Sequence, residues 1–84
     1  MNLEEQFEQA QLDARMLPER PDNQTMLQIY GLFEQAWHGD VEGSRPGFTD
    51  LAGREKCDAW AELKGLKRED AMQQYIDLIA MLAD

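Results

Sequence analysis

Proline and glycine residues divide this chain into four helix-length segments, and no segment shows the alternating polar and apolar pattern of a strand. The first segment begins after Asn2, which can form a capping box with Glu5 three residues later. Pro18 and Pro21 end this helix and stiffen the connection that follows. The apolar residues of the segment recur on one helical face, at Leu3, Phe7, Ala10, Ala14 and Leu17.

The second segment predicts the most apolar helix of the chain. Asp22 is its N-cap, and Gly39 ends it just after His38. Its apolar residues cover more than one stripe, so this helix is either central in a bundle or lines an apolar cleft with its second face. Helix-packing rules favour the central position. The residues concerned are Met26, Leu27, Ile29, Tyr30, Leu32, Phe33, Ala36 and Trp37.

Residues 39–49 have no periodicity and are rich in turn-forming residues, which indicates a long loop of a kind that is often functional. Asp50 then caps a third helix that is expected to end at Gly65. The fourth helix is expected from about Lys67 to Leu82, with Lys67 standing where an Asp or Ser cap would be favoured. The sequence therefore predicts an all-α fold in a single domain over residues 1–84.

Composition narrows the functional classes further. The formal charge is −9 and the isoelectric point is about 4.4, so nucleic acids and anionic membrane surfaces would be repelled. No apolar run approaches the length of a membrane span, and the N-terminus is unlike a signal peptide. A single cysteine, Cys57, cannot form an internal disulfide. We therefore expect a cytoplasmic chain without nucleic-acid partners or integral membrane association.

No enzyme signature stands out. His38 and Cys57 are the one candidate pair of base and nucleophile, but one of each in a short chain is close to chance, and the two cannot make a four-ligand zinc site. Gly39, Gly43 and Gly47 lie in a loop with no preceding strand, which excludes the usual phosphate loops. The sequence predicts a non-enzymatic protein without metal or cofactor.

Basic residues are unevenly distributed along the chain. Such a local excess can mark a site for a small anionic ligand on an acidic protein, or it can be a solvated helix face, and composition alone favours the solvated face. Five of the eight basic residues are Arg54, Lys56, Lys64, Lys67 and Arg68.

Short motifs follow one another at fixed spacing from the second segment to the end of the chain. They include Met26-Leu27-x-Ile29-Tyr30, Phe33-x-Gln35-Ala36, Gly39-Asp40, Arg45-Pro46-Gly47, Asp50-Leu51, Gly53-Arg54-x-Lys56, Asp58-Ala59-Trp60, Glu62-Leu63-Lys64-Gly65 and Glu69-Asp70-Ala71-Met72-x-x-Tyr75-Ile76. Each motif alone is weak, but the ordered set is specific. It resembles the acyl-CoA-binding protein family over nearly the whole chain.

The resemblance implies an up-down-down-up four-helix bundle with a long loop between its second and third helices. It also implies a monomeric, non-enzymatic carrier of long-chain fatty acyl-CoA. By position, Tyr30 and Tyr75 would contact the adenine and phosphates, Lys56 would pair with the 3′-phosphate, and Arg15 would lie near the head group. Aromatic faces suit a purine and cations suit phosphate oxygens. The acyl groove would be lined by Met26, Leu27 and Phe33.

Two positions depart from the family pattern. Glu34 stands where the family usually has a lysine at the 3′-phosphate, and a carboxylate there would repel the phosphate. Arg54 or Arg20 could compensate as a head-group cation. Cys57 stands where an aromatic residue is common, which predicts looser packing around the third helix.

A second functional class stays open from the sequence. The chain could be a helical protein–protein interaction module that keeps the fold while its acyl-CoA binding is weak or lost. Its partner would dock on the exposed face of the second helix, and Trp37 and Phe48 at the margins of the long loop would be the natural anchors.

Overall fold

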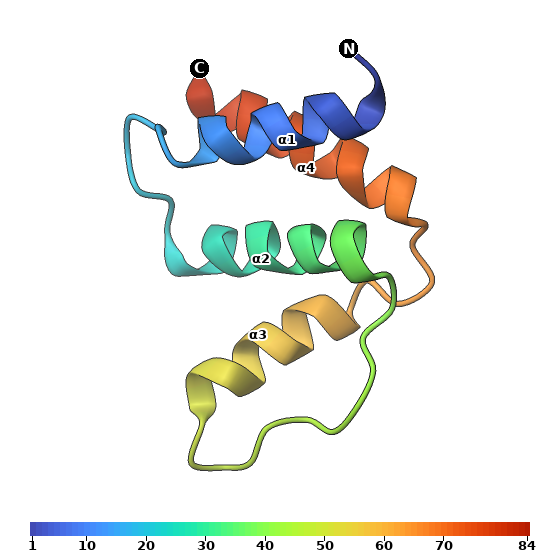
Figure 1. Ribbon diagram of the computed structural model, residues 1–84. Helices are drawn as coiled ribbons and strands as arrows, with labels where there is room; N and C mark the ends of the chain where they lie inside the picture. The colour runs from blue at the N-terminus through green and yellow to red at the C-terminus, as the bar shows by residue number, and fades with distance from the viewer.

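The computed structural model describes all 84 residues and consists of four α-helices without a strand (Figure 1). The helices are α1 (Leu3–Ala14), α2 (Asn23–His38), α3 (Leu51–Ala61) and α4 (Arg68–Ala83). The all-α prediction is confirmed. No helix combines the length and the hydrophobicity that a membrane crossing requires.

The order and direction of the helices match the up-down-down-up expectation. In Figure 1, α2 and α3 run in one direction, whereas α1 and α4 run in the opposite direction. α4 packs against both α1 and α2, and α2 packs in addition against α3. α2 and α4 are therefore the two central helices, and the position of α2 between α3 and α4 explains why its apolar surface is wider than one stripe. α3 contacts no helix other than α2.

Polar side chains cap three of the helix starts. The side chain of Asn2 accepts a hydrogen bond from the backbone N–H of Glu5 at 2.8 Å, and the Glu5 carboxylate accepts one from the Asn2 N–H at 3.1 Å. Asp22 and Asp50 each accept a bond from the N–H three residues later, at 2.8 and 2.9 Å. Lys67 makes no side-chain cap, as its chemistry predicted.

Two helices end earlier than the sequence predicted. α1 ends at Ala14 instead of continuing to the first proline, and α3 ends at Ala61 instead of at Gly65. Directly after α1, and from Leu63 on after α3, the backbone hydrogen bonds join residues three apart, at 3.0 to 3.2 Å for the first two bonds of each, so the chain tightens into a narrower turn. Gly65 then reverses the chain direction after α3 with a φ of 90°.

The fully buried core belongs to α1, α2 and α4. Its members interdigitate across the two interfaces that α4 makes, whereas no residue of α3 is fully buried. α3 is thus held on the outside of a three-helix unit and packs against α2 alone among the helices. The buried apolar residues are Phe7, Ala10, Leu32, Ala36, Ala71, Met72, Tyr75 and Ile79.

Candidate functional site

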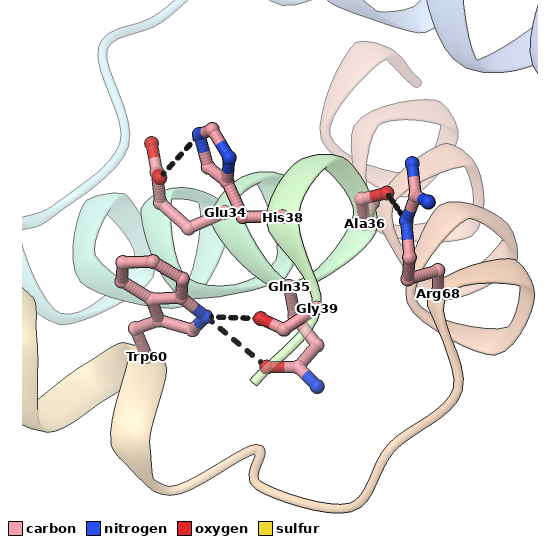
Figure 2. A network of polar contacts seen from close by, with 7 residues as sticks. All are labelled: Glu34, Gln35, Ala36, His38, Gly39, Trp60 and Arg68. Carbon is pink, nitrogen blue, oxygen red and sulfur yellow. Dashed lines mark hydrogen bonds and ion pairs between the residues drawn. The ribbon is translucent and has the colours of Figure 1, made fainter. Parts of the chain in front are cut away.

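A buried polar network fixes α3 against α2 (Figure 2). The side-chain nitrogen of Gln35, a residue with 0% exposure, donates to the Leu66 carbonyl and to the Asp40 carboxylate, both at 2.8 Å. The indole N–H of Trp60 donates to the side-chain oxygen of Gln35 at 3.1 Å and to the Gly39 carbonyl at 2.8 Å. Because every polar atom of the glutamine is satisfied, this network can orient α3 without a burial penalty.

The network extends into the turn between α3 and α4. The Asp40 carboxylate accepts a hydrogen bond from the Gly65 N–H at 2.8 Å and another from Gln35. These bonds, the one from Gly65 first, hold the pKa of Asp40 below its ordinary value. Arg68 at the start of α4 donates to the carbonyl of Ala36 at 3.1 Å, which ties α4 to the end of α2 (Figure 2).

With α3 fixed in this way, Lys56 and Tyr30 meet. The Lys56 ammonium lies 5.7 Å from the centroid of the Tyr30 ring, within the range of a cation–π contact. Burial raises the pKa of Tyr30, and Glu34 and Cys57 raise it further by their charge, so these two side chains lie near the Tyr30 ring. We call Tyr30 and Glu34 of α2 with Lys56 and Cys57 of α3 the Tyr30 face.

Glu34 does not extend into solvent. Its carboxylate lies 3.5 Å from Nε2 of His38, one turn along α2, and its side chain is 17% exposed (Figure 2). The His38 ring in turn lies 5.9 Å from the ring of Trp60, between centroids. The residue that departs from the family pattern is therefore a partly buried acid on the same face as the exposed ammonium of Lys56.

Tyr75 occupies the core and is only 4% exposed. Its ring meets the edge of Phe7 at 5.2 Å and lies 6.3 Å from the ring of Phe33. Burial raises the pKa of Tyr75, and the positive charge of Arg15 acts in the opposite direction, which places that guanidinium nearby. Tyr75 and Arg15 form a second group of predicted residues, apart from the Tyr30–Lys56 contact.

The three residues predicted for the acyl groove do not line one cavity. Phe33 is half-buried and stacks on Trp37, with centroids 6.1 Å apart and planes at 7°. Met26 borders a cavity of about 290 Å³ between the end of α1 and the start of α2. Leu27 borders a cavity of about 550 Å³ that α3 and α4 also line. Neighbouring positions on a helix point about 100° apart, which explains the separation.

The cations expected near the head group are also divided. Arg54 donates to the carbonyl of Pro46 at 3.1 Å, and its guanidinium lies 4.5 Å over the ring of Phe48. Arg54 is thus engaged with the long loop, and no contact joins it to the Tyr30 face. Arg15 and Arg20 instead border the smaller cavity together.

Gln35 and Asp40 occur in the motifs described above, but the sequence predicted no functional role for either residue. A local signal was present, because Gln35 lies between Phe33 and Ala36 on the apolar part of the helix, and an amide buried there requires hydrogen-bond partners. No group of three or more metal-ligating side chains occurs. A cation over an aromatic ring, together with a partly apolar cavity bordered by Arg15 and Arg20, is typical of a helical bundle that binds a small anionic ligand.

The family model for acyl-CoA-binding protein matches residues 4–79, so this chain belongs to that family. The acyl-CoA-binding protein homolog of Manduca sexta is 43% identical over 83 residues, covering 98% of this chain and 92% of the relative. Acyl-CoA-binding domain-containing protein 1 of Oryza sativa is 42% identical over 84 residues, covering 100% of this chain and 92% of the relative.

The solved structures agree with these relatives. The crystal structure of Oryza sativa acyl-CoA-binding protein 2 superposes with a TM-score of 0.92 at 40% identity, covering 96% of this chain and 90% of that chain. The resemblance read from the ordered motifs is confirmed, as is the four-helix fold that it implied.

Proposed function

We propose that this protein binds long-chain fatty acyl-CoA esters and carries them without catalysing a reaction. The observation that carries the proposal is the Lys56 ammonium beside the Tyr30 ring, on a chain that belongs to the acyl-CoA-binding protein family. The relatives are named for acyl-CoA binding. An aromatic ring beside a cation suits a purine that carries a phosphate.

In this proposal, the nucleotide head lies against the Tyr30 face. The adenine stacks near Tyr30, and the 3′-phosphate pairs with Lys56, whose ammonium is exposed. Arg15 and Arg20, at the mouth of the smaller cavity, provide positive charge for the remaining phosphates. Tyr75 contributes only through the small part of its side chain that remains exposed.

The acyl chain in this proposal runs along the apolar surface of Met26 and Phe33 toward the smaller cavity. Met26 is 38% exposed, and Ile29 lines the same cavity. Burying a palmitoyl chain contributes on the order of 12 kcal/mol gross, at about 0.8 kcal/mol per methylene, before association and ordering costs. Leu27 faces the larger cavity, so the proposal leaves it out of the groove.

The proposal also covers the oligomeric state of the protein, its location in the cell and its need for cofactors. A carrier of this kind acts as a monomer in the cytoplasm, and it needs neither cofactor nor metal. Support comes from the single unpaired Cys57, since a chain without disulfides gains nothing from an oxidising compartment.

Titration calorimetry with palmitoyl-CoA, free CoA and palmitate tests the proposal. We expect palmitoyl-CoA to bind more tightly than either fragment, because only the thioester engages both the cationic head-group residues and the apolar surface. Equal affinities for palmitate and palmitoyl-CoA would contradict the head-group assignment.

The interaction module through Trp37 and Phe48 has weaker support. Both side chains are exposed, at 55% and 84%. However, Trp37 stacks on Phe33, while Phe48 is covered on one side by Arg54, so each side chain is already engaged within the protein. If calorimetry showed no binding of palmitoyl-CoA, free CoA or palmitate, this interaction module would become the favoured function.

A further inference from the structure

A groove with an apolar floor lies on the side of α2 that faces away from Tyr30. Gln28 lines this groove, and it points about 200° around the helix from Tyr30, since successive residues turn by about 100°. The volume is about 550 Å³, and the apolar floor comprises Leu27, Leu32, Ala59 and Leu63. Gln24, Gln28 and Leu32 therefore place most of the groove on a different side of α2 from Tyr30, and Leu27, about 60° from Tyr30, is the lining residue of α2 nearest to it.

The groove exists because α3 and α4 do not touch. Both helices pack on α2 but make no contact with each other, so α2 forms the floor between them, and Ala59 and Leu63 add apolar surface from the α3 side. Gln74 of α4 lines one wall, and α3 forms the other. Leu27 and Leu63 remain only partly buried, which leaves apolar surface available to a partner.

The α3 wall is acidic along its length. Glu55, Asp58 and Glu62 line the groove, and no lysine or arginine does. Arg45 neutralises Asp58 through two hydrogen bonds, at 2.6 and 2.9 Å, whereas Glu55 and Glu62 form no ion pair and accept no side-chain hydrogen bond. Glu62 directly follows the last residue of α3 and is seven residues from Glu55, so the Cα atoms of the two glutamates lie about 10 Å apart along this side of the groove.

The opposite side of the groove offers uncharged hydrogen-bonding groups. Gln24 and Gln28 of α2 and Gln74 of α4 line it, and none of their side-chain amides bonds to another group of the protein. An occupant can therefore place apolar groups on the floor, cations against α3, and polar groups beside the glutamines.

We propose that this groove docks a basic amphipathic helix of a partner protein. The two free carboxylates, on Glu55 of α3 and on Glu62 directly after it, are about two helical turns apart, and so match lysines or arginines spaced two turns apart on a partner helix. A small cation would meet one carboxylate and leave the apolar floor uncovered. Because most of the groove lies on a different side of α2 from the Tyr30 face, a carrier and its acyl-CoA cargo could be recognised together.

The test uses the full chain and a fluorescent peptide of about 18 residues, with leucines on one helical face and lysines beside them. A second peptide carries glutamates in place of the lysines, and a third has the basic composition in scrambled order. We expect anisotropy titrations to show binding of the amphipathic basic peptide only. Equal binding of the scrambled peptide, or no binding of any peptide, overturns the proposal.

Matched charge reversals locate the site. The double variant Glu55→Lys and Glu62→Lys should weaken peptide binding by about tenfold or more, because it replaces two attractive charges by repulsive ones. The control Glu4→Lys and Glu8→Lys makes the same change of charge on exposed positions of α1, and should weaken binding much less. Equal losses of peptide affinity in the two double variants would mean that net charge alone attracts the peptide, and would overturn the groove as its docking site.

Two further measurements separate this proposal from the acyl-CoA assignment. The groove variant should keep the helical circular dichroism of the parent and its affinity for palmitoyl-CoA, since neither glutamate lies on the Tyr30 face. Palmitoyl-CoA should not displace the peptide. Displacement of the peptide by spermine at concentrations near the peptide's own dissociation constant would identify a small-cation site, and would overturn the peptide as occupant.

Discussion

Gly31 of α2 lies directly against the backbone of Ala59 of α3. A Cβ at Gly31 would stand 2.8 Å from the Ala59 carbonyl oxygen and 3.4 Å from a methyl carbon of Leu63. Only a residue without a side chain permits this approach. Together with the bond between Gln35 and Trp60, the contact sets how far α3 stands from α2, and hence the separation across the Tyr30 face.

We expect Gly31→Ala to lower the free energy of unfolding by about 1–3 kcal/mol, because the new methyl group meets backbone that cannot move aside. The higher helix propensity of alanine, about 1 kcal/mol, offsets only part of this cost. Urea denaturation measures the difference. Gly47→Ala is the control, since a Cβ at Gly47 would meet no atom within 4 Å; equal unfolding free energies for the two variants would contradict the tight contact.

Most of the fold could be predicted from local patterns. Helical periodicity, the capping box at Asn2 and the Asp22 and Asp50 caps placed the helix starts within about one residue. The ends of α1 and α3 were predicted too late, because the chain tightens gradually before the proline or glycine that finally stops it. A proline or glycine marks the position beyond which a helix cannot continue, but the last helical hydrogen bond can lie several residues before it.

The site could be predicted only in part. Aligned motifs brought Tyr30 and Lys56 to one face, because both lie on helices whose order the pattern also gave. Two features could not be predicted: the contact of Arg54 with the long loop, and the placement of Met26 and Leu27 in different cavities. Both depend on how the helices and the loop are placed relative to one another, and the spacing of residues within one helix does not predict that placement. Gly31 offered one local signal, an unfavourable residue in the middle of a helix.

Lys56→Ala should weaken palmitoyl-CoA binding by about 2 kcal/mol, because it removes the cation proposed to pair with the 3′-phosphate. The unfolding free energy should change little, since Lys56 is exposed and its one recorded contact is with the Tyr30 ring. Calorimetry and thermal denaturation measure the two effects. Lys67→Ala removes the same charge at the start of α4 and should leave binding nearly unchanged; a similar loss from both would point to net charge instead of a phosphate contact.

Asp40 should make stability depend on pH at the acid end. Hydrogen bonds from Gly65 and Gln35 hold its folded-state pKa below the ordinary value of 3.8. The ionised carboxylate therefore contributes stability above pH 3.8 that is lost as the pH falls through the lower, folded-state value. Asp40→Asn should be less stable than the parent at pH 7, and the difference should shrink near pH 3. An unfolding difference that stays constant between these pH values would exclude this role.

Glu34 gives the last prediction, because the acid lies on the face proposed for the 3′-phosphate. The negative charge of Glu34 helps to raise the pKa of Tyr30, and the Glu34 side chain is only 17% exposed. We expect Glu34→Lys to tighten palmitoyl-CoA binding by about 1–3 kcal/mol, since an attractive charge replaces a repulsive one at a partly shielded distance. Calorimetry at two salt concentrations measures the gain, which should shrink as ionic strength rises.

Two controls separate phosphate recognition by the Glu34 position from a general effect of charge. Glu34→Gln removes the repulsion without adding attraction, and should therefore recover only part of the gain. The thioester of dephospho-CoA lacks the 3′-phosphate, so the advantage of the lysine variant should fall for that ligand. If both variants bind palmitoyl-CoA like the parent, the pairing with His38 at 3.5 Å already keeps the carboxylate away from the ligand. Recognition of the head group would then depend on Lys56 and Arg15.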